Sequence, residues 1–180
     1  NNCDQYLAES VAQVDRLAAM VNDVLRSGSV AEQALRQEKR LRIDKLLAEV
    51  VDDYVLLAKI RGMTFEVNAE PTTIRANRDM MRHVISNLVS NAVRHGDAGS
   101  MITITCDQRE LAIENACKPL TRQQLQHVFD PFYRTSDGAK QHADSSGIGL
   151  YTVKMLLDAK SLDYEFVPHG QGMRFVVRFE

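Results

Sequence analysis

The stretch SSGIGLYTVKMLL (residues 145–157) places Gly147 and Gly149 at the start of a segment that is otherwise typical of a helix. Val153 and Leu157 recur at helical spacing, and glycine inside a helix costs about 0.5–1 kcal/mol relative to alanine. Close approach of the backbone to a neighbour would offset that cost. An anion bound by the free N–H groups of a helix start would offset it as well. On this stretch alone, a tight junction with glycines for packing explains the pattern as well as an anion does.

The composition is that of a globular chain. It has 180 residues, of which 44% are hydrophobic and 26% charged, and this length suits one domain or one domain with an accessory element. The formal net charge of −2 argues against a general nucleic-acid-binding protein. Cys3, Cys106 and Cys117 have no metal-ligand spacing and indicate free thiols in a reducing compartment. No apolar run approaches the length of a membrane span, and because the first residue is Asn1 we expect a fragment of a longer protein.

Residues 5–26 carry apolar side chains at alternating spacings of four and three. The positions are Leu7, Val11, Val14, Ala18, Val21 and Leu25. Such a seam predicts an amphipathic helix whose partner helix lies outside this chain, and packing of the helix on the globular part is the alternative. A polar segment follows to about residue 40. We therefore expect two parts, residues 1–37 and residues 38–180.

The second part alternates helices with paired strands. We expect a helix capped by Asp44 and ending at Arg61, with Gly62 as its left-handed terminator. We expect another helix that opens at Asn77 or Asp79 and runs through His95. The other expected elements are strands at 41–43, 63–69 and 72–76, a short helix near 121–127, and hairpins of 101–107 with 111–115 and of 164–168 with 173–179. The pattern indicates an α+β fold, most simply one sheet with its helices on one face.

The helix expected at 77–95 has two different faces. Its apolar face should meet the core and consists of Met81, Ile85, Leu88 and Ala92. On another face Asn87, Asn91 and Arg94 follow at i, i+4 and i+7, and His95 lies four residues after Asn91. Asparagine is a mediocre helix former, whereas its amide oxygen suits Mg²⁺, and Arg94 and His95 could meet phosphate oxygens. A solvent-facing surface that happens to be rich in asparagine is the alternative.

One ligand would explain both unusual segments. The stretch VFDPFYRTSDGAKQHADSS (128–146) lies between them in the sequence and is typical of a mobile loop. A Mg²⁺–triphosphate held between the two helices and covered by this loop would account for the asparagines, the glycines and the loop together.

Three segments resemble motifs of sensor histidine kinases, in the order of that family. They are HVISNLVSNAVRHG (83–96), similar to its asparagine box, VFDPFYR (128–134), similar to its phenylalanine box, and SSGIGLYTVK (145–154), similar to its second glycine box. Three ordered motifs are a strong signal where any one is weak. The resemblance covers about residues 38–180, and residues 5–26 look like the second helix of the dimerisation and phosphotransfer hairpin. Within the family, the chain looks closest to the vancomycin-resistance sensor type.

The resemblance implies a two-layer α/β sandwich of the histidine kinase, gyrase and Hsp90 ATPase type, preceded by an N-terminal amphipathic helix. It implies ATP and Mg²⁺ as cofactors. Asn91 would coordinate Mg²⁺, Asn87 would lie beside the triphosphate, and Arg134 could reach the γ-phosphate. Phe129 and Phe132 would anchor the loop that covers the nucleotide. The other nucleotide-binding residues that the resemblance implies are Arg94, His95, Ser146, Gly147, Ile148, Gly149 and Leu150.

The first glycine box of the family, DxGxG after a strand, is altered. The segment IENACKPL (113–120) takes its place, with Asn115 where the aspartate belongs and no glycine. An asparagine oxygen can accept the same hydrogen bond from the adenine amino group, but its NH₂ must find another partner. We expect Asn115 to contact adenine and the loop after it to be short or rigid, with weaker nucleotide binding. Ser145 also stands where a further glycine is common.

The expected activity is that of an ATP-dependent protein histidine kinase. The γ-phosphoryl group would pass from Mg·ATP to a histidine of the dimerisation hairpin and then to an aspartate of a response regulator. Expected partners are a response regulator receiver domain and a second copy through the N-terminal helix, with no nucleic acid. The expected location is the cytoplasmic portion of a sensor in the inner or plasma membrane.

The positions of the histidines limit what this chain can do alone, and two other functions remain as alternatives. All five histidines lie in the ATP-binding region, at His83, His95, His127, His142 and His169, so this chain is expected to lack the phosphoacceptor. One alternative is a non-catalytic nucleotide-sensing or partner-docking module with a decayed first glycine box. Another is a different ATPase of the superfamily, such as an anti-sigma-factor kinase acting on serine. The seam at 5–26 favours the sensor kinase over the latter.

Overall fold

The computed structural model describes residues 38–135 and 147–179. The helix predicted at 5–26 and the part of the predicted loop from 136 to 146 lie outside the described residues. In chain order the elements are β1 (Lys39–Arg42), α2 (Ile43–Ile60), β2 (Thr64–Ala69), β3 (Thr73–Ala76), α3 (Arg78–His95), β4 (Met101–Cys106), β5 (Glu110–Ala116), α4 (Arg122–His127), α6 (Gly149–Lys160), β6 (Tyr164–His169) and β7 (Gly172–Arg178).

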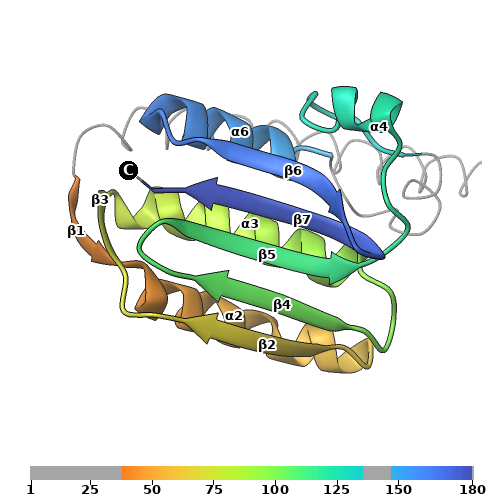
Figure 1. Ribbon diagram of the computed structural model, residues 1–180, viewed down its shortest axis with the longest axis horizontal. Coiled ribbons are helices and arrows are strands. Elements are labelled where there is room, and N and C mark those ends of the chain that lie inside the picture. The colour runs from red at the N-terminus through yellow and green to blue at the C-terminus, as the bar shows by residue number, and fades with distance from the viewer. Residues whose placement is uncertain (1–37, 136–146, 180) are drawn as a thin grey trace, which may run out of the picture.

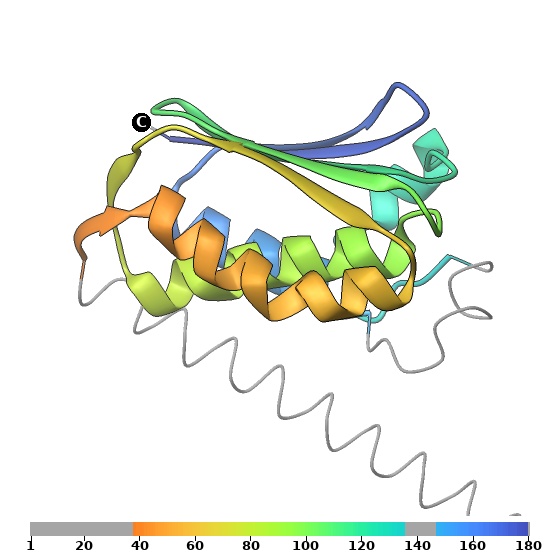
Figure 2. The same ribbon diagram turned by 90° about the horizontal axis from the view of Figure 1, so that it is seen from below.

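The main sheet has five strands in the order β2-β4-β5-β7-β6. Helices α2, α3 and α6 cover one of its faces, so the predicted α+β sandwich of two layers is confirmed (Figures 1 and 2). The predicted hairpins β4–β5 and β6–β7 are both present, and antiparallel pairing of β5 with β7 joins them. Strand β2 pairs in parallel with β4. The chain can return in the same direction because it crosses over through α3.

The prediction of a single sheet is wrong at one end of the molecule. Strands β1 and β3 form a separate antiparallel pair, in which Lys39 lies opposite Ala76 and Arg42 opposite Thr73 (Figure 1). Each strand leads into a helix, β1 into α2 and β3 into α3. The pair buries Leu41 and Ala76. Two short strands therefore tie the starts of two neighbouring helices together and close the end of the core.

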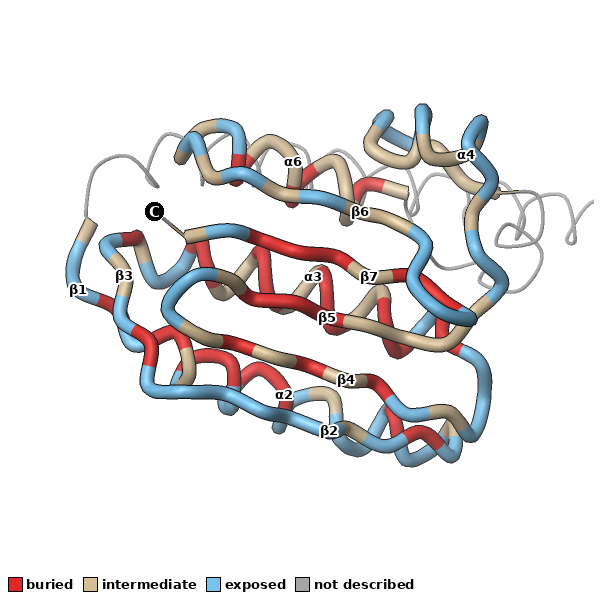
Figure 3. Tube along the Cα trace, in the orientation of Figure 1, coloured by how far each residue is buried: buried red, intermediate tan, exposed pale blue. Residues whose placement is uncertain are grey.

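The core lies between the sheet and the three helices (Figure 3). Helix α3 packs against both α2 and α6. Its predicted apolar face is confirmed, because each of the four side chains is at most 4% exposed: Met81, Ile85, Leu88 and Ala92. Burial of this face fixes the rotation of α3 about its axis, and with it the direction of its polar residues. Within the described part of the chain, no helix combines the length and the apolar character that a membrane span requires.

The helix ends follow local rules with one correction. Of the two predicted openings of α3, the structure has Asn77, whose side-chain oxygen accepts from the backbone N–H groups of Asp79 at 2.9 Å and Met80 at 3.1 Å. Gly62 after α2 has φ +68°, the predicted left-handed terminator. The predicted cap at Asp44 is wrong, since α2 begins at Ile43. The Asp44 carboxylate instead accepts from Arg42 Nε at 2.7 Å and from the backbone N–H of Thr72 at 3.2 Å.

Candidate functional site

The two asparagines of α3 face the first residue of α6. A Cβ added at Gly149 would lie 3.0 Å from Asn87 Oδ1 and 3.9 Å from Asn91 Oδ1. Both asparagines are half-buried, so a purely solvent-facing asparagine surface does not describe them. The structure thus brings together the two segments that the sequence singled out.

Asn87 presents its oxygen to α6 because its amide nitrogen is engaged elsewhere. Asn87 Nδ2 donates to the backbone carbonyl of His83, one turn earlier, at 2.9 Å. Helix α6 begins with backbone N–H groups that have no partner within the helix, and no described side chain caps it at Ile148. Amide oxygens and helix-start N–H groups therefore lie next to each other. This combination suits a cation together with its anionic counterpart.

Gly147 joins the phenylalanine segment to the start of α6. Its φ is +72°, and a Cβ there would lie 2.9 Å from the carbonyl carbon of Phe132 and 3.0 Å from Tyr133 O. The backbone N–H of Phe132 donates to Gly147 O at 3.0 Å. Close approach of the backbone to a neighbour therefore accounts for both glycines, with Phe132 beside Gly147 and Asn87 beside Gly149. An anion is compatible with this arrangement but is not needed to explain the glycines.

The remaining predicted residues play different structural parts. Ile148 is buried, and Leu150 packs against the core, so neither is directed to solvent. Arg134 is half-buried and Phe132 is 52% exposed. Phe129 anchors its segment, with ring centroids 5.6 Å from Tyr164 and 6.2 Å from Phe175. Arg94 and His95 are exposed in the last turn of α3. Ser146 lies outside the described residues.

Asn115 lies at the other end of the same helix. It is in β5 and shares the helix-facing side of that strand with Leu111 and Ile113, since side chains alternate along a strand. A Cβ added at Gly96, directly after α3, would lie 3.6 Å from Asn115 Nδ2. Asn87, Asn91 and Asn115 therefore line the region beside α3, from its middle to its C-terminal end.

Three residues at this end were missed from the sequence. Gly96 allows a tight approach, because a Cβ there would lie 2.5 Å from Met63 Cε and 2.6 Å from Ala92 O. Its position at the end of the quoted 83–96 segment was the available signal. Gly172 of β7 lets the strands meet beside Asn115, since a Cβ there would lie 2.0 Å from Asn115 O.

The third missed residue is Arg61, for which the sequence offers no signal. The Arg61 guanidinium donates to the backbone carbonyls of Arg94 and, at 2.8 Å, of Gly96. These are carbonyls at the end of α3, which a helix leaves without intrahelical partners. Arg61, at the end of α2, thus holds the C-terminal end of α3 beside Asn115.

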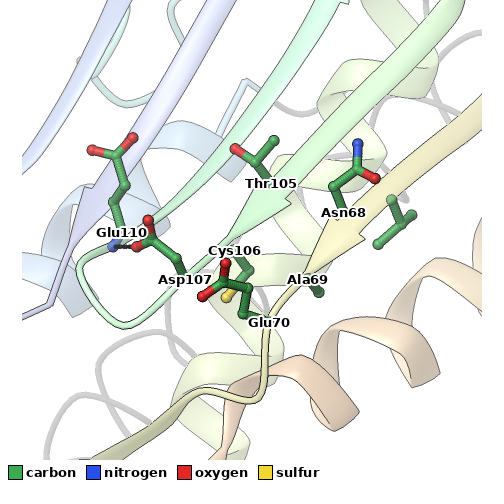
Figure 4. A pocket seen from close by; sticks show the side chains of 8 residues that line it. Asn68, Ala69, Glu70, Thr105, Cys106, Asp107 and Glu110 are labelled. Carbon is green, nitrogen blue, oxygen red and sulfur yellow. Dashed lines mark hydrogen bonds between the residues drawn. The ribbon is translucent and has the colours of Figure 1, made fainter.

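A separate hollow of about 510 Å³ lies at the ends of β2 and β4 and the start of β5 (Figure 4). Glu70, Asp107 and Glu110 line it, so its charge opposes a phosphate ligand. The backbone N–H groups of Arg109 and Glu110 hold the pKa of Asp107 below its ordinary value. Burial raises the pKa of the Cys106 thiol to about 11, which leaves the thiol protonated and unreactive. None of the predicted site residues lines this hollow.

Comparison with known proteins shows the family to which this chain belongs. Residues 76–180 match the family described as histidine kinase-, DNA gyrase B-, and HSP90-like ATPase. The sensor histidine protein kinase HK06 of Streptococcus pneumoniae is 32% identical over 174 residues, which cover 96% of this chain and 39% of that protein. The chain belongs to the histidine kinase-, DNA gyrase B- and HSP90-like ATPase family, and sensor histidine kinases are its homologues. It spans about two fifths of the length of HK06.

Solved structures share the fold. The catalytic domain of histidine kinase ThkA superposes with a TM-score of 0.70 at 20% identity, covering 79% of this chain and 95% of that chain. ThkA in complex with the response regulator protein TrrA gives 0.69 at 18% identity, covering 94% and 48%. Full-length ShkA in complex with AMPPNP gives 0.72 at 23% identity, covering 91% and 35%. The finer resemblance to the vancomycin-resistance sensor type stays a prediction.

Proposed function

We propose that residues 38–180 are the ATP-binding catalytic domain of a sensor histidine kinase and that residues 1–37 belong to its dimerisation hairpin. The observation that carries the proposal is the convergence of Asn87 and Asn91 on the start of α6. A family ATPase domain matched over residues 76–180 supports it.

The residues present fit Mg·ATP. Asn91 Oδ1 would serve as a neutral oxygen ligand for Mg²⁺, and Asn87 Oδ1 lies close enough to act beside it. The N–H groups at the start of α6 would bind phosphate oxygens, as the freedom of Gly147 and Gly149 from side chains permits. Arg94, His95, Phe132, Arg134 and Ser146 are proposed to complete the nucleotide contacts. When bound, Mg·ATP supplies the transferable phosphoryl group and neutralises part of its charge.

In this proposal the residues of the chain position the reactants and exclude water. Arg134, with Asn87, would stabilise charge as the γ-phosphoryl group leaves for a histidine of the hairpin. A response regulator would then receive the group, and a second copy would dimerise through residues 5–26. The ThkA–TrrA complex supports the choice of partner, since it holds a histidine kinase together with a response regulator protein. The domain would lie on the cytoplasmic side of a membrane sensor.

A non-catalytic nucleotide-sensing module is the second candidate. The observation that favours it is the altered loop after β5, where Cys117 and Pro119 stand in place of the glycines of the family motif. Such a module would bind nucleotide without donating its phosphoryl group.

Two measurements on residues 1–180 test these candidates. Calorimetric titration with Mg²⁺ and a non-hydrolysable ATP analogue should show saturable binding. With γ-labelled ATP, label should pass to a separately supplied hairpin that carries a histidine. Binding without transfer would favour the sensing module, and absence of binding would contradict both candidates.

A further inference from the structure

Asn115 carries a buried hydrogen-bond donor that the fold does not satisfy. Its Nδ2 atom is buried and makes no hydrogen bond with any described residue. Buried polar groups in folded proteins nearly always have partners, and an unsatisfied one is costly. The residue as a whole is only half-buried, so a small rearrangement at the end of β5 would open this buried amide to a ligand.

The neighbouring Cys117 does not satisfy this donor. Burial raises the pKa of the Cys117 thiol, and the Asn115 side chain offsets part of that rise, so the two groups do sense each other. A thiol sulfur is only a weak acceptor, and the pair does not reach ordinary hydrogen-bond geometry. An acceptor from outside the described residues is thus the missing partner.

A carboxamide offers what a carboxylate cannot. It presents one acceptor, Oδ1, and one donor, Nδ2, side by side, whereas an ionised aspartate can only accept. Adenine presents the complementary pair on its Watson–Crick edge, with the exocyclic amino group as donor and the ring nitrogen N1 as acceptor. When proteins recognise DNA bases, asparagine makes the analogous pair of hydrogen bonds on another edge of adenine, with the amino group and the ring nitrogen N7.

We propose that Asn115 recognises adenine through two hydrogen bonds, accepting from the exocyclic amino group through Oδ1 and donating to N1 through Nδ2. The inference rests on the proposed function, because it places a nucleotide beside α3. It goes beyond that function by assigning a ring-nitrogen contact to the residue that replaces the aspartate of the family motif. Asn115 thereby becomes a specificity-determining residue that reads two atoms of the base without a charge.

Calorimetric titration of residues 1–180 with Mg·ATP and with the Mg²⁺ complex of 1-deaza-ATP tests the inference. The analogue keeps the amino group and replaces N1 by C–H. We expect it to bind about tenfold more weakly, since it leaves the buried Nδ2 unsatisfied again. In Asn115→Asp the donor is gone, so the ratio of the two affinities should fall to about one. Glu114→Gln is the matched control, because Glu114 lies on the opposite face of β5 and its replacement should leave the ratio unchanged.

The outcomes separate the two proposals. Equal binding of ATP and 1-deaza-ATP to the unaltered chain would overturn the ring-nitrogen contact and leave the proposed function standing. Absence of binding by both nucleotides would overturn the proposed function and the inference with it. The affinities of the unaltered chain for ATP and 1-deaza-ATP test the ring-nitrogen contact even if Asn115→Asp fails to fold. Circular dichroism of each variant reports its folding.

Discussion

At the scale of single residues, the proposed function depends on which neighbour each side chain contacts. Asparagine is unfavourable inside a helix, and both Asn87 and Asn91 face the start of α6, where the proposed ligand would bind. The orientation of the Asn87 amide is fixed by a hydrogen bond. Its Nδ2 donates to His83 O, so that Oδ1 faces α6.

Asn91→Ala should weaken Mg²⁺-dependent binding of a non-hydrolysable ATP analogue by roughly 10–100-fold, since even outer-shell partners of metals contribute that much. The apolar face of α3 is untouched, so the thermal midpoint should hardly change. Calorimetric titration with and without Mg²⁺ measures the effect. Asn68→Ala, the same change on exposed β2, is the control. Unchanged affinity and Mg²⁺ dependence in Asn91→Ala would remove Asn91 from the proposed site.

Gly147→Ala and Gly170→Ala form a second test. Both glycines have positive φ, +72° and +56°, so alanine should cost about 1 kcal/mol at either position from backbone conformation alone. Only at Gly147 does the new Cβ meet backbone, that of Phe132 and Tyr133, while nothing lies within 4 Å at Gly170. Urea denaturation should show the larger loss for Gly147→Ala, and only this variant should lose nucleotide affinity. Equal effects of the two changes would mean that the contact with Phe132 is not needed.

At the scale of elements, the start of α2 is held by residues from neighbouring segments. Asp44 in the first turn of α2 bonds to Arg42 and to the backbone of Thr72, just before β3. The Arg42 guanidinium and the Thr72 N–H hold the pKa of Asp44 at about 2, below its ordinary value of 3.8. The link therefore depends on the ionised carboxylate.

Asp44→Asn should lower the free energy of unfolding at pH 7. Because the pKa of Asp44 is depressed in the folded state, its stabilisation is present above pH 3.8 and is lost as pH falls through about 2. The difference between the unaltered chain and Asp44→Asn should therefore shrink between pH 4 and pH 2, as followed by denaturant unfolding at each pH. Exposed Asp52→Asn in the middle of α2 is the control and should change little. A difference that stays constant with pH would show that the charge of Asp44 does not stabilise this junction.

At the scale of the whole molecule, the described residues share the fold of histidine kinase catalytic domains. The phosphoacceptor of the proposed reaction would lie on the hairpin helix that precedes the helix predicted at 5–26, and this chain spans 39% of HK06. No histidine precedes His83 in the sequence. The predicted seam helix therefore offers no imidazole for attack.

Residues 1–180 incubated with γ-labelled ATP should stay unlabelled, because all five histidines lie in the proposed ATP-binding domain, residues 38–180. A hairpin that carries a histidine, added separately, should accept label. Alkaline and acid treatment of the labelled products distinguishes phosphohistidine, which is acid-labile, from phosphoserine. Acid-labile phosphate on the chain itself would contradict its assignment as the donor alone.

Local signals in the sequence determined most of the helices and hairpins of this protein and several of its candidate site residues. Periodicity identified α3 and its buried face, Asn77 and Gly62 marked helix ends, and the two hairpins followed from strands with short turns. Ordered motifs pointed to the family and to Asn87, Asn91, Gly147 and Gly149. These signals act between residues close in the chain, which is why the sequence alone reveals them.

Only the tertiary structure decided the contacts between distant segments. It separated the β1–β3 pair from the main sheet, set β2 parallel to β4, and gave Asp44 a partner in Thr72 instead of a capping role. It also placed Gly149 against Asn87 and left Asn115 Nδ2 buried, with no hydrogen bond to any residue of 38–135 or 147–179. Such contacts depend on how the helices pack on the sheet, and packing is a property of the whole chain that no short stretch of residues encodes.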